Sequence, residues 1–128
     1  MRTIFLELMT FFLLLVSSTT GWSADFEKGL VAYESGDFAA ALKELQPLAE
    51  QGVARAQGKL GTMYRKGQGV PQNSKTAVRW YRLAAEQGDA SAQNNLGLMY
   101  AYGQGVPEND KTAMKWYALA AKQGYVDT

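Results

Sequence analysis

The 128-residue sequence contains no cysteine and no histidine. The absence of cysteine excludes disulfide bonds, thiolate metal sites and acylation at a lipoprotein cysteine. Without histidine, the chain also lacks the commonest general base and the commonest transition-metal ligand. We therefore predict a protein that is not an enzyme, with no catalytic residue, no cofactor and no metal site.

Neither sign of charge is in excess, since 13 Lys and Arg stand against 12 Asp and Glu. Nucleic-acid binding needs a basic stripe, so we predict no nucleic-acid partner. The acidic residues show no recurring pair that would suit an acid and a base. Two of them, Asp37 and Asp110, are interpreted as N-caps of helices. The apolar content of 47% is ordinary for a globular chain.

Long apolar runs are also missing, apart from residues 4–16, which two polar residues interrupt. A membrane-spanning helix needs roughly 20 apolar residues. Arg2 precedes this run and mostly small, polar residues follow it. This layout predicts a secretory signal peptide over residues 1–23, cleaved after Ser23 or Ala24. The mature chain would then be periplasmic or secreted, with no membrane span. The alternative is an N-terminal core helix.

The sequence repeats itself with a period of 36 residues. Residues 52–87 and 88–123 are identical at 23 of 36 positions, which indicates a duplication. In each unit the apolar positions predict two helices, the first over residues 54–66 and 90–102. The Gly-Gln-Gly-Val-Pro segment between the helices is interpreted as a turn. It lacks the Lys-Ser/Thr pair of a phosphate-binding loop.

Residues 24–51 are interpreted as a degenerate tetratricopeptide-like unit. The distance from Tyr33 to Ala41 is 8 residues, whereas that from Tyr64 to Ala77 is 13. We therefore expect this unit to lack about five residues of the turn. Residues 124–128 are interpreted as the truncated start of a further unit.

Five motifs occur in both full units, within residues 54–88 and 90–124: Ala-x-Ala-Gln, Leu-Gly-x-Met-Tyr, Gly-x-Gly-Val-Pro, Ala-x-x-Trp-Tyr and Ala-Ala-x-Gln-Gly. In these motifs the chain resembles the Sel-one-like repeat family, a relative of the tetratricopeptide repeat. The resemblance implies an all-α fold, an α/α superhelix of tandem helical hairpins that binds protein or peptide partners. It implies no catalytic residues.

The candidate binding residues lie on the first helix of each full unit, at positions that differ between the units. In tetratricopeptide-like arrays these helices line the concave face. We predict a groove that is basic at one end and apolar at the other, suited to an extended peptide or a partner helix. The alternative is an ordinary solvated helix surface. The predicted groove residues are Arg55, Lys59, Thr62, Arg65, Ser91, Asn95, Leu98 and Tyr102.

The aromatic pairs Trp80-Tyr81 and Trp116-Tyr117 recur with the same period and are interpreted as packing residues between repeats. A competing hypothesis is a cell-envelope protein that binds peptidoglycan or polysaccharide through surface aromatics. Repeat arrays normally end in a capping helix. The last predicted helix has none, so either it is tolerated as an exposed end, or the array docks onto another molecule, or the chain is a truncated family member. The exposed helix also makes self-association an expectation.

Overall fold

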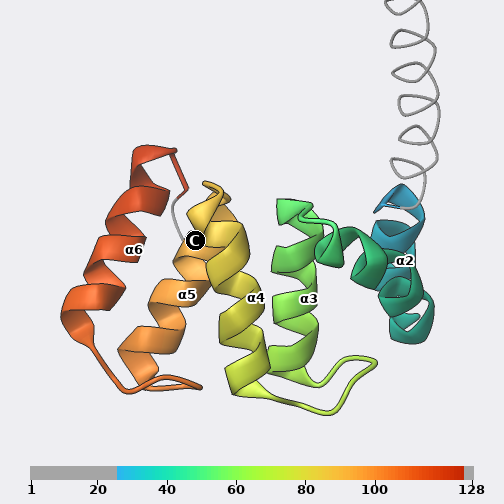
Figure 1. The fold of residues 1–128 in the computed structure, drawn as a ribbon, viewed down its shortest axis with the longest axis horizontal. Coiled ribbons are helices and arrows are strands. Elements are labelled where there is room, and N and C mark those ends of the chain that lie inside the picture. The colour runs from blue at the N-terminus through green and yellow to red at the C-terminus, as the bar shows by residue number, and fades with distance from the viewer. Residues whose placement is uncertain (1–25, 126–128) are drawn as a thin grey trace, which may run out of the picture.

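The computed structural model describes residues 26–125, and this part of the chain contains helices but no strand (Figure 1). The helices pair into three hairpins that stack side by side, so the predicted all-α solenoid is confirmed. The signal peptide predicted over residues 1–23 lies outside the described residues. The helices are residues 26–34, α2 (Phe38–Glu50), α3 (Ala54–Lys66), α4 (Ser74–Glu86), α5 (Ala90–Tyr102) and α6 (Asp110–Lys122).

Four helices begin with a side-chain cap that accepts the backbone N–H three residues later. Asp37, Asn73, Asp89 and Asn109 cap α2, α4, α5 and α6, with N–O distances of 3.2, 3.0, 2.8 and 3.0 Å. The prediction for Asp37 is confirmed, but that for Asp110 is wrong. Asn109 is the cap, and Asp110 is the first residue of α6. There its negative charge lies at the positive end of the helix dipole.

The turn inside each full unit packs against the preceding hairpin. Gly67 ends α3 in the left-handed region, at φ 68°, and Gly69 has φ 75°. A Cβ on Gly69 would lie only 2.9 Å from the carbonyl oxygen of Phe38, at the start of α2. In the next unit, Gly105 approaches the carbonyl oxygen of Ser74 in the same way. Glycine is needed here both for the positive φ and for the close approach of two backbones.

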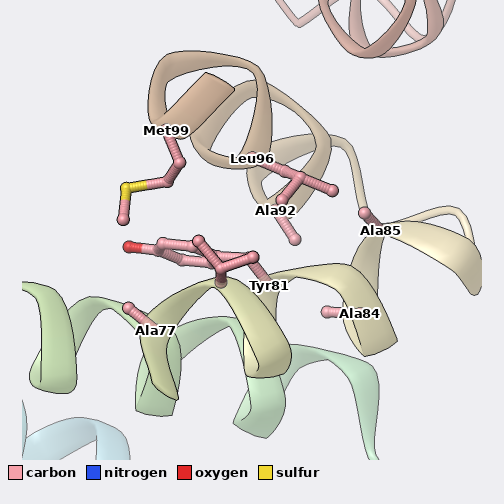
Figure 2. Packing of buried hydrophobic residues seen from close by; sticks show 8 residues of the cluster. Ala77, Tyr81, Ala84, Ala85, Ala92, Leu96 and Met99 are labelled. Carbon is pink, nitrogen blue, oxygen red and sulfur yellow. The ribbon is translucent and has the colours of Figure 1, made fainter. Parts of the chain in front are cut away.

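Two hydrophobic clusters form the core, one between α2 and α3 and the other between α4 and α5. Tyr81 is the largest fully buried side chain. Figure 2 shows it extending from α4 toward Ala92, Leu96 and Met99 of α5. The packing role predicted for Tyr81 is therefore confirmed. Trp80 and Trp116 are half-buried, and they pack against the α2–α3 cluster and the α4–α5 cluster, respectively, as predicted. Tyr117 is also half-buried.

One glycine in the first helix of each unit admits a large side chain from the second helix. A Cβ on Gly61 would lie 2.7 Å from the Tyr81 ring, and one on Gly29 would lie 2.8 Å from Leu45. Gly29 is therefore the counterpart of Gly61. From Gly29 to Ala41 is 12 residues, whereas from Gly61 to Ala77 is 16. The first unit is thus shorter by four residues, close to the predicted five or so. The small difference arises because packing aligns Gly29 with Gly61, whereas the sequence comparison had aligned Tyr33 with Tyr64.

A pair of glutamines joins the two helices of each full unit. The buried Gln57 donates from Nε2 to the carbonyl oxygen of Ala49 at 3.0 Å. Its Oε1 accepts from Nε2 of Gln87 at 2.8 Å. Gln93 and Gln123 repeat this pair, with an N–O distance of 3.0 Å. Because each buried amide has partners, the Gln of the Ala-x-Ala-Gln motif has a structural role.

Candidate functional site

The first helices of all three hairpins line one open hollow of about 220 Å³. Four of the eight predicted groove residues meet there, namely Arg55 and Lys59 from the first half of α3, Thr62 from its second half, and Ser91 from the start of α5. The structure also adds residues from the degenerate unit and from the α4–α5 connection. The lining consists of Phe26, Arg55, Gly58, Lys59, Thr62, Asp89 and Ser91.

The two cationic side chains of the hollow lie over aromatic rings of the helix formed by residues 26–34. The Cζ of Arg55 lies 4.7 Å from the centroid of the Phe26 ring. The Nζ of Lys59 lies 4.6 Å from the centroid of the Tyr33 ring. Each such contact contributes about 0.5–1 kcal/mol at an exposed site. Within residues 26–125, neither cation forms an ion pair with an acidic side chain.

Asp89 brings a negative charge to the edge of this hollow. Its Oδ1 is occupied as the cap of α5, because it accepts from the N–H of Ala92 at 2.8 Å. With Arg55 and Lys59 opposite it, the lining keeps a formal charge of +1. The site can therefore attract a singly charged anion.

Thr62 and Arg65 were predicted as groove residues, but both also reach into the buried part of the protein. Oγ1 of Thr62 lies 2.8 Å from the hydroxyl oxygen of Tyr81, within hydrogen-bond distance. Arg65 is half-buried, and its Nε is buried without a hydrogen-bond partner among the described residues. Burial raises the pKa of the Tyr81 phenol above its ordinary value of 10.0, although the hydrogen bond with Thr62 and the charge of Arg65 partly oppose this rise.

The raised pKa of Tyr81 predicts a loss of stability at alkaline pH. The unfolded chain releases this proton near pH 10, whereas the folded chain holds it to higher pH. Stability is thus fully present below pH 10 and falls as the pH rises through the folded pKa. Urea unfolding should show the Tyr81→Phe variant less stable by about 1 kcal/mol at neutral pH, through the lost hydrogen bond. The difference in the free energy of unfolding between the native chain and Tyr81→Phe should become smaller above pH 10. If the two plots of unfolding free energy against pH stay parallel up to pH 11, the raised pKa of Tyr81 is contradicted.

The other four predicted groove residues do not line the hollow. Arg65 lies further along α3, and Asn95 and Leu98 are half-buried on α5. Tyr102, at the end of α5, is 71% exposed. Ser91, Asn95, Leu98 and Tyr102 follow one another at spacings of three and four residues, so they share one face of α5. That face leads away from the hollow.

Phe26, Gly58 and Asp89 are the three lining residues that the sequence analysis did not predict. Phe26 belongs to the first helix of the degenerate unit, which the sequence comparison aligned with the full repeats one residue away from the alignment that packing gives. Asp89 precedes Ala90, where an N-cap is expected, and this was the available signal. Its place in the hollow follows only from how α3 and α5 pack.

Two further surfaces bear on the competing hypotheses. A hollow of about 270 Å³ is lined by Tyr64, Thr76, Arg79, Trp80 and Leu83. On α6, Met114 is 66% exposed, whereas its counterpart Val78 on α4 is only 3% exposed beneath α5. No described helix covers α6 in the same way, and self-association through this surface stays a prediction.

Among residues 26–125, no helix is long and apolar enough to cross a membrane.

Comparisons with known proteins agree with this architecture. The family model of the Sel1 repeat matches residues 54–89 and 90–125. A Sel1 repeat protein from Oxalobacter formigenes is similar in structure, with 40% identity, a TM-score of 0.75 and coverage of 79% of this chain. A protective antigen of uropathogenic Escherichia coli with an SLR fold has 36% identity, a TM-score of 0.77 and 85% coverage.

The chain spans only 40% and 24% of the lengths of these two proteins. A search of the curated proteins found no match to it. The two matched units contain both glutamine pairs and the glycines that admit Tyr81 and Tyr117. The chain therefore belongs to the Sel1 repeat family.

Proposed function

We propose that this chain is an exported, non-catalytic interaction module that binds a protein or peptide segment on the face formed by its first helices. Sel1 repeat proteins generally mediate protein–protein interaction. The observation that supports binding on this face is the hollow in which Arg55 and Lys59 form no ion pair among the described residues. The exposed Tyr102 extends the same helix face and provides an apolar contact.

Export is part of the proposal and rests on the N-terminal sequence alone. The signal layout of residues 1–23 directs the mature chain to the periplasm or beyond a bacterial cell. The partner is then expected in the cell envelope or outside the cell. N-terminal sequencing of the protein recovered from the envelope fraction tests this: a chain that begins at Ala24 or Asp25 supports export, and one that retains Met1 opposes it.

A crosslinking pull-down from the cell envelope tests the binding face. The bait is the chain itself, and the variant replaces Arg55, Lys59, Leu98 and Tyr102 by alanine. We expect the native chain to retain a protein partner that the variant loses by about tenfold or more, because clustered charged and aromatic contacts dominate binding energy.

The matched control replaces two exposed cations, a leucine and a tyrosine that lie away from this face: Lys43, Lys111, Leu119 and Tyr125. This control should capture the partner as well as the native chain does. Equal capture by the native chain and by the groove variant would show that the face is not the binding site.

The second candidate function is binding of peptidoglycan or polysaccharide. It is favoured by the hollow beside Trp80, where a half-buried indole lies next to Arg79 and Tyr64. Aromatic rings of this kind provide stacking surfaces with polar edges. A separate assay pellets the chain with purified peptidoglycan. Pelleting that is lost in Trp80→Ala but kept in the groove variant would favour this function over the first.

A further inference from the structure

We propose that the hollow between the first helices binds the side-chain carboxylate of an Asp or Glu in an extended peptide. The same peptide then runs along α5 and places an apolar side chain against Leu98 and Tyr102. This inference rests on the proposed function and specifies the chemistry of its partner. Four observations support it: the net charge of the lining, the aromatic contacts of its two cations, the volume of the hollow and the length of the neighbouring face of α5.

The charge of the lining fits a single carboxylate. Arg55 and Lys59 face the hollow with no ion pair among residues 26–125, and Asp89 offsets one of the two charges. The remaining formal charge of +1 balances one carboxylate. A phosphate, which carries between −1.5 and −2 at neutral pH, would be left undercompensated beside Asp89. The hydroxyl group of Ser91, which also lines the hollow, provides a further donor for a carboxylate oxygen.

Both cations already have an aromatic contact within the protein in the absence of a ligand. Arg55 stacks on the Phe26 ring at 4.7 Å, and Lys59 lies above the Tyr33 ring at 4.6 Å. The Tyr33 ring is itself held, because its hydroxyl donates to Oε1 of Gln68 at 3.0 Å. Long cationic side chains normally lose conformational freedom when they bind, and part of that loss has already occurred here.

The size of the hollow favours a small group such as one side chain. At about 220 Å³ it is smaller than the roughly 300–1,000 Å³ of typical sites for small molecules and cofactors. A single acidic side chain suits such a volume better than a nucleotide or an oligosaccharide does. The rest of the ligand must then lie outside the hollow, on the neighbouring helix surface.

The neighbouring surface of α5 sets the length of that ligand. Residues 90–102 contain no charged side chain, and their outward face changes from Ser91 through Asn95 to Leu98 and Tyr102. At about 1.5 Å per helical residue, Ser91 and Tyr102 are about 16 Å apart along the axis. An extended peptide covers this span in about five residues, at about 3.3 Å each. We therefore expect an acidic residue and an apolar residue about five positions apart.

Selection from a phage library of random dodecapeptides, with the 128-residue chain as bait, tests this inference. We expect the selected pool to be enriched in an acidic residue and an apolar residue at about that separation. One selected peptide is then synthesised with an amidated C-terminus and a fluorescent label, so that the acidic side chain remains the only carboxylate if the peptide contains a single acid. Fluorescence anisotropy gives its Kd.

Three variants and one control make the result specific. Replacing both cations, as Arg55→Gln with Lys59→Gln, should weaken binding by about tenfold or more, because hydrogen bonds to charged groups are lost. Asp89→Asn keeps an N-cap but removes the opposing charge, so binding should tighten by about two- to fivefold. Tyr102→Ala should weaken binding of the native peptide and reduce selection of the apolar residue. The control, Lys43→Gln with Lys111→Gln, removes the same charge at exposed sites on α2 and α6 and should leave the Kd unchanged.

The outcomes separate this inference from the proposed function. If peptides are selected without an acidic residue, or if the Arg55 and Lys59 variant binds them equally well, the carboxylate site is wrong while peptide binding stands. If no peptide is enriched above background, both fall. Far-ultraviolet circular dichroism of each variant shows whether its helices remain, and Asp89→Asn provides a gain of affinity that an unfolded variant does not produce.

Discussion

Replacing Tyr81 by alanine is expected to lower the free energy of unfolding by about 3–5 kcal/mol, the range for removal of a large buried aromatic side chain. Tyr81 is fully buried between α4 and α5 (Figure 2). Its ring also packs closely against Gly61 of α3. The truncation leaves a cavity where three helices meet and removes the hydrogen-bond partner of Thr62. Chemical denaturation of the native chain and the variant measures the difference.

The same variant should also lose cooperativity. Repeat arrays depend on contacts between neighbouring units, and Tyr81 provides the largest of the buried side chains between the second and third hairpins. Thermal unfolding should therefore become broader as well as lower in Tm. The control is Tyr102→Ala, which removes the same side chain from a position that is 71% exposed and should change stability by less than about 0.5 kcal/mol. Equal losses in the two variants would refute the role of Tyr81 in the core.

Replacing Gly61 by alanine is expected to destabilise the chain by about 1–2 kcal/mol. Alanine normally stabilises a helix relative to glycine by about 0.5–1 kcal/mol. At Gly61, however, the new Cβ would meet the Tyr81 ring at 2.7 and 2.8 Å. That ring is fully buried and cannot move aside without disturbing α5. Overpacking of this kind costs about 1–3 kcal/mol, which outweighs the gain in helix propensity.

Gly58 provides the matched control on the same helix. A Cβ there would have only ordinary contacts, at 3.9 Å from Ala92 and from Asp89. Gly58→Ala should thus leave the stability unchanged or raise it by up to about 1 kcal/mol. The stability change of Gly97→Ala should fall between those of Gly61→Ala and Gly58→Ala. Its Cβ would meet the Tyr117 ring at 2.8 Å, but that ring is only half-buried. A stabilising effect at Gly61 equal to that at Gly58 would contradict the close packing.

Much of the candidate site was predictable at the level of single helices. The periodic positions and the difference between the two full units placed Arg55, Lys59, Thr62 and Ser91 on outward positions, and all four line the hollow. The comparison of units could not show which outward residues also have partners inside the protein. Thr62 is one of these residues, because its hydroxyl group lies beside that of Tyr81, a contact that Leu98 cannot make at the equivalent position.

The sequence by itself determined the helices, their order and the family. These features depend on local signals, such as the cap at Asn73 and the positive φ at Gly67, and on a repeated pattern that requires no knowledge of contacts. Only the tertiary structure decided that Phe26 and Asp89 join Arg55 and Lys59 in one hollow. These residues come from different hairpins, and their meeting depends on how far each helix approaches its neighbour. Side-chain volumes at positions such as Gly61 and Tyr81 set that distance. The spacing of residues along the sequence does not reveal it, because these side chains come from different helices.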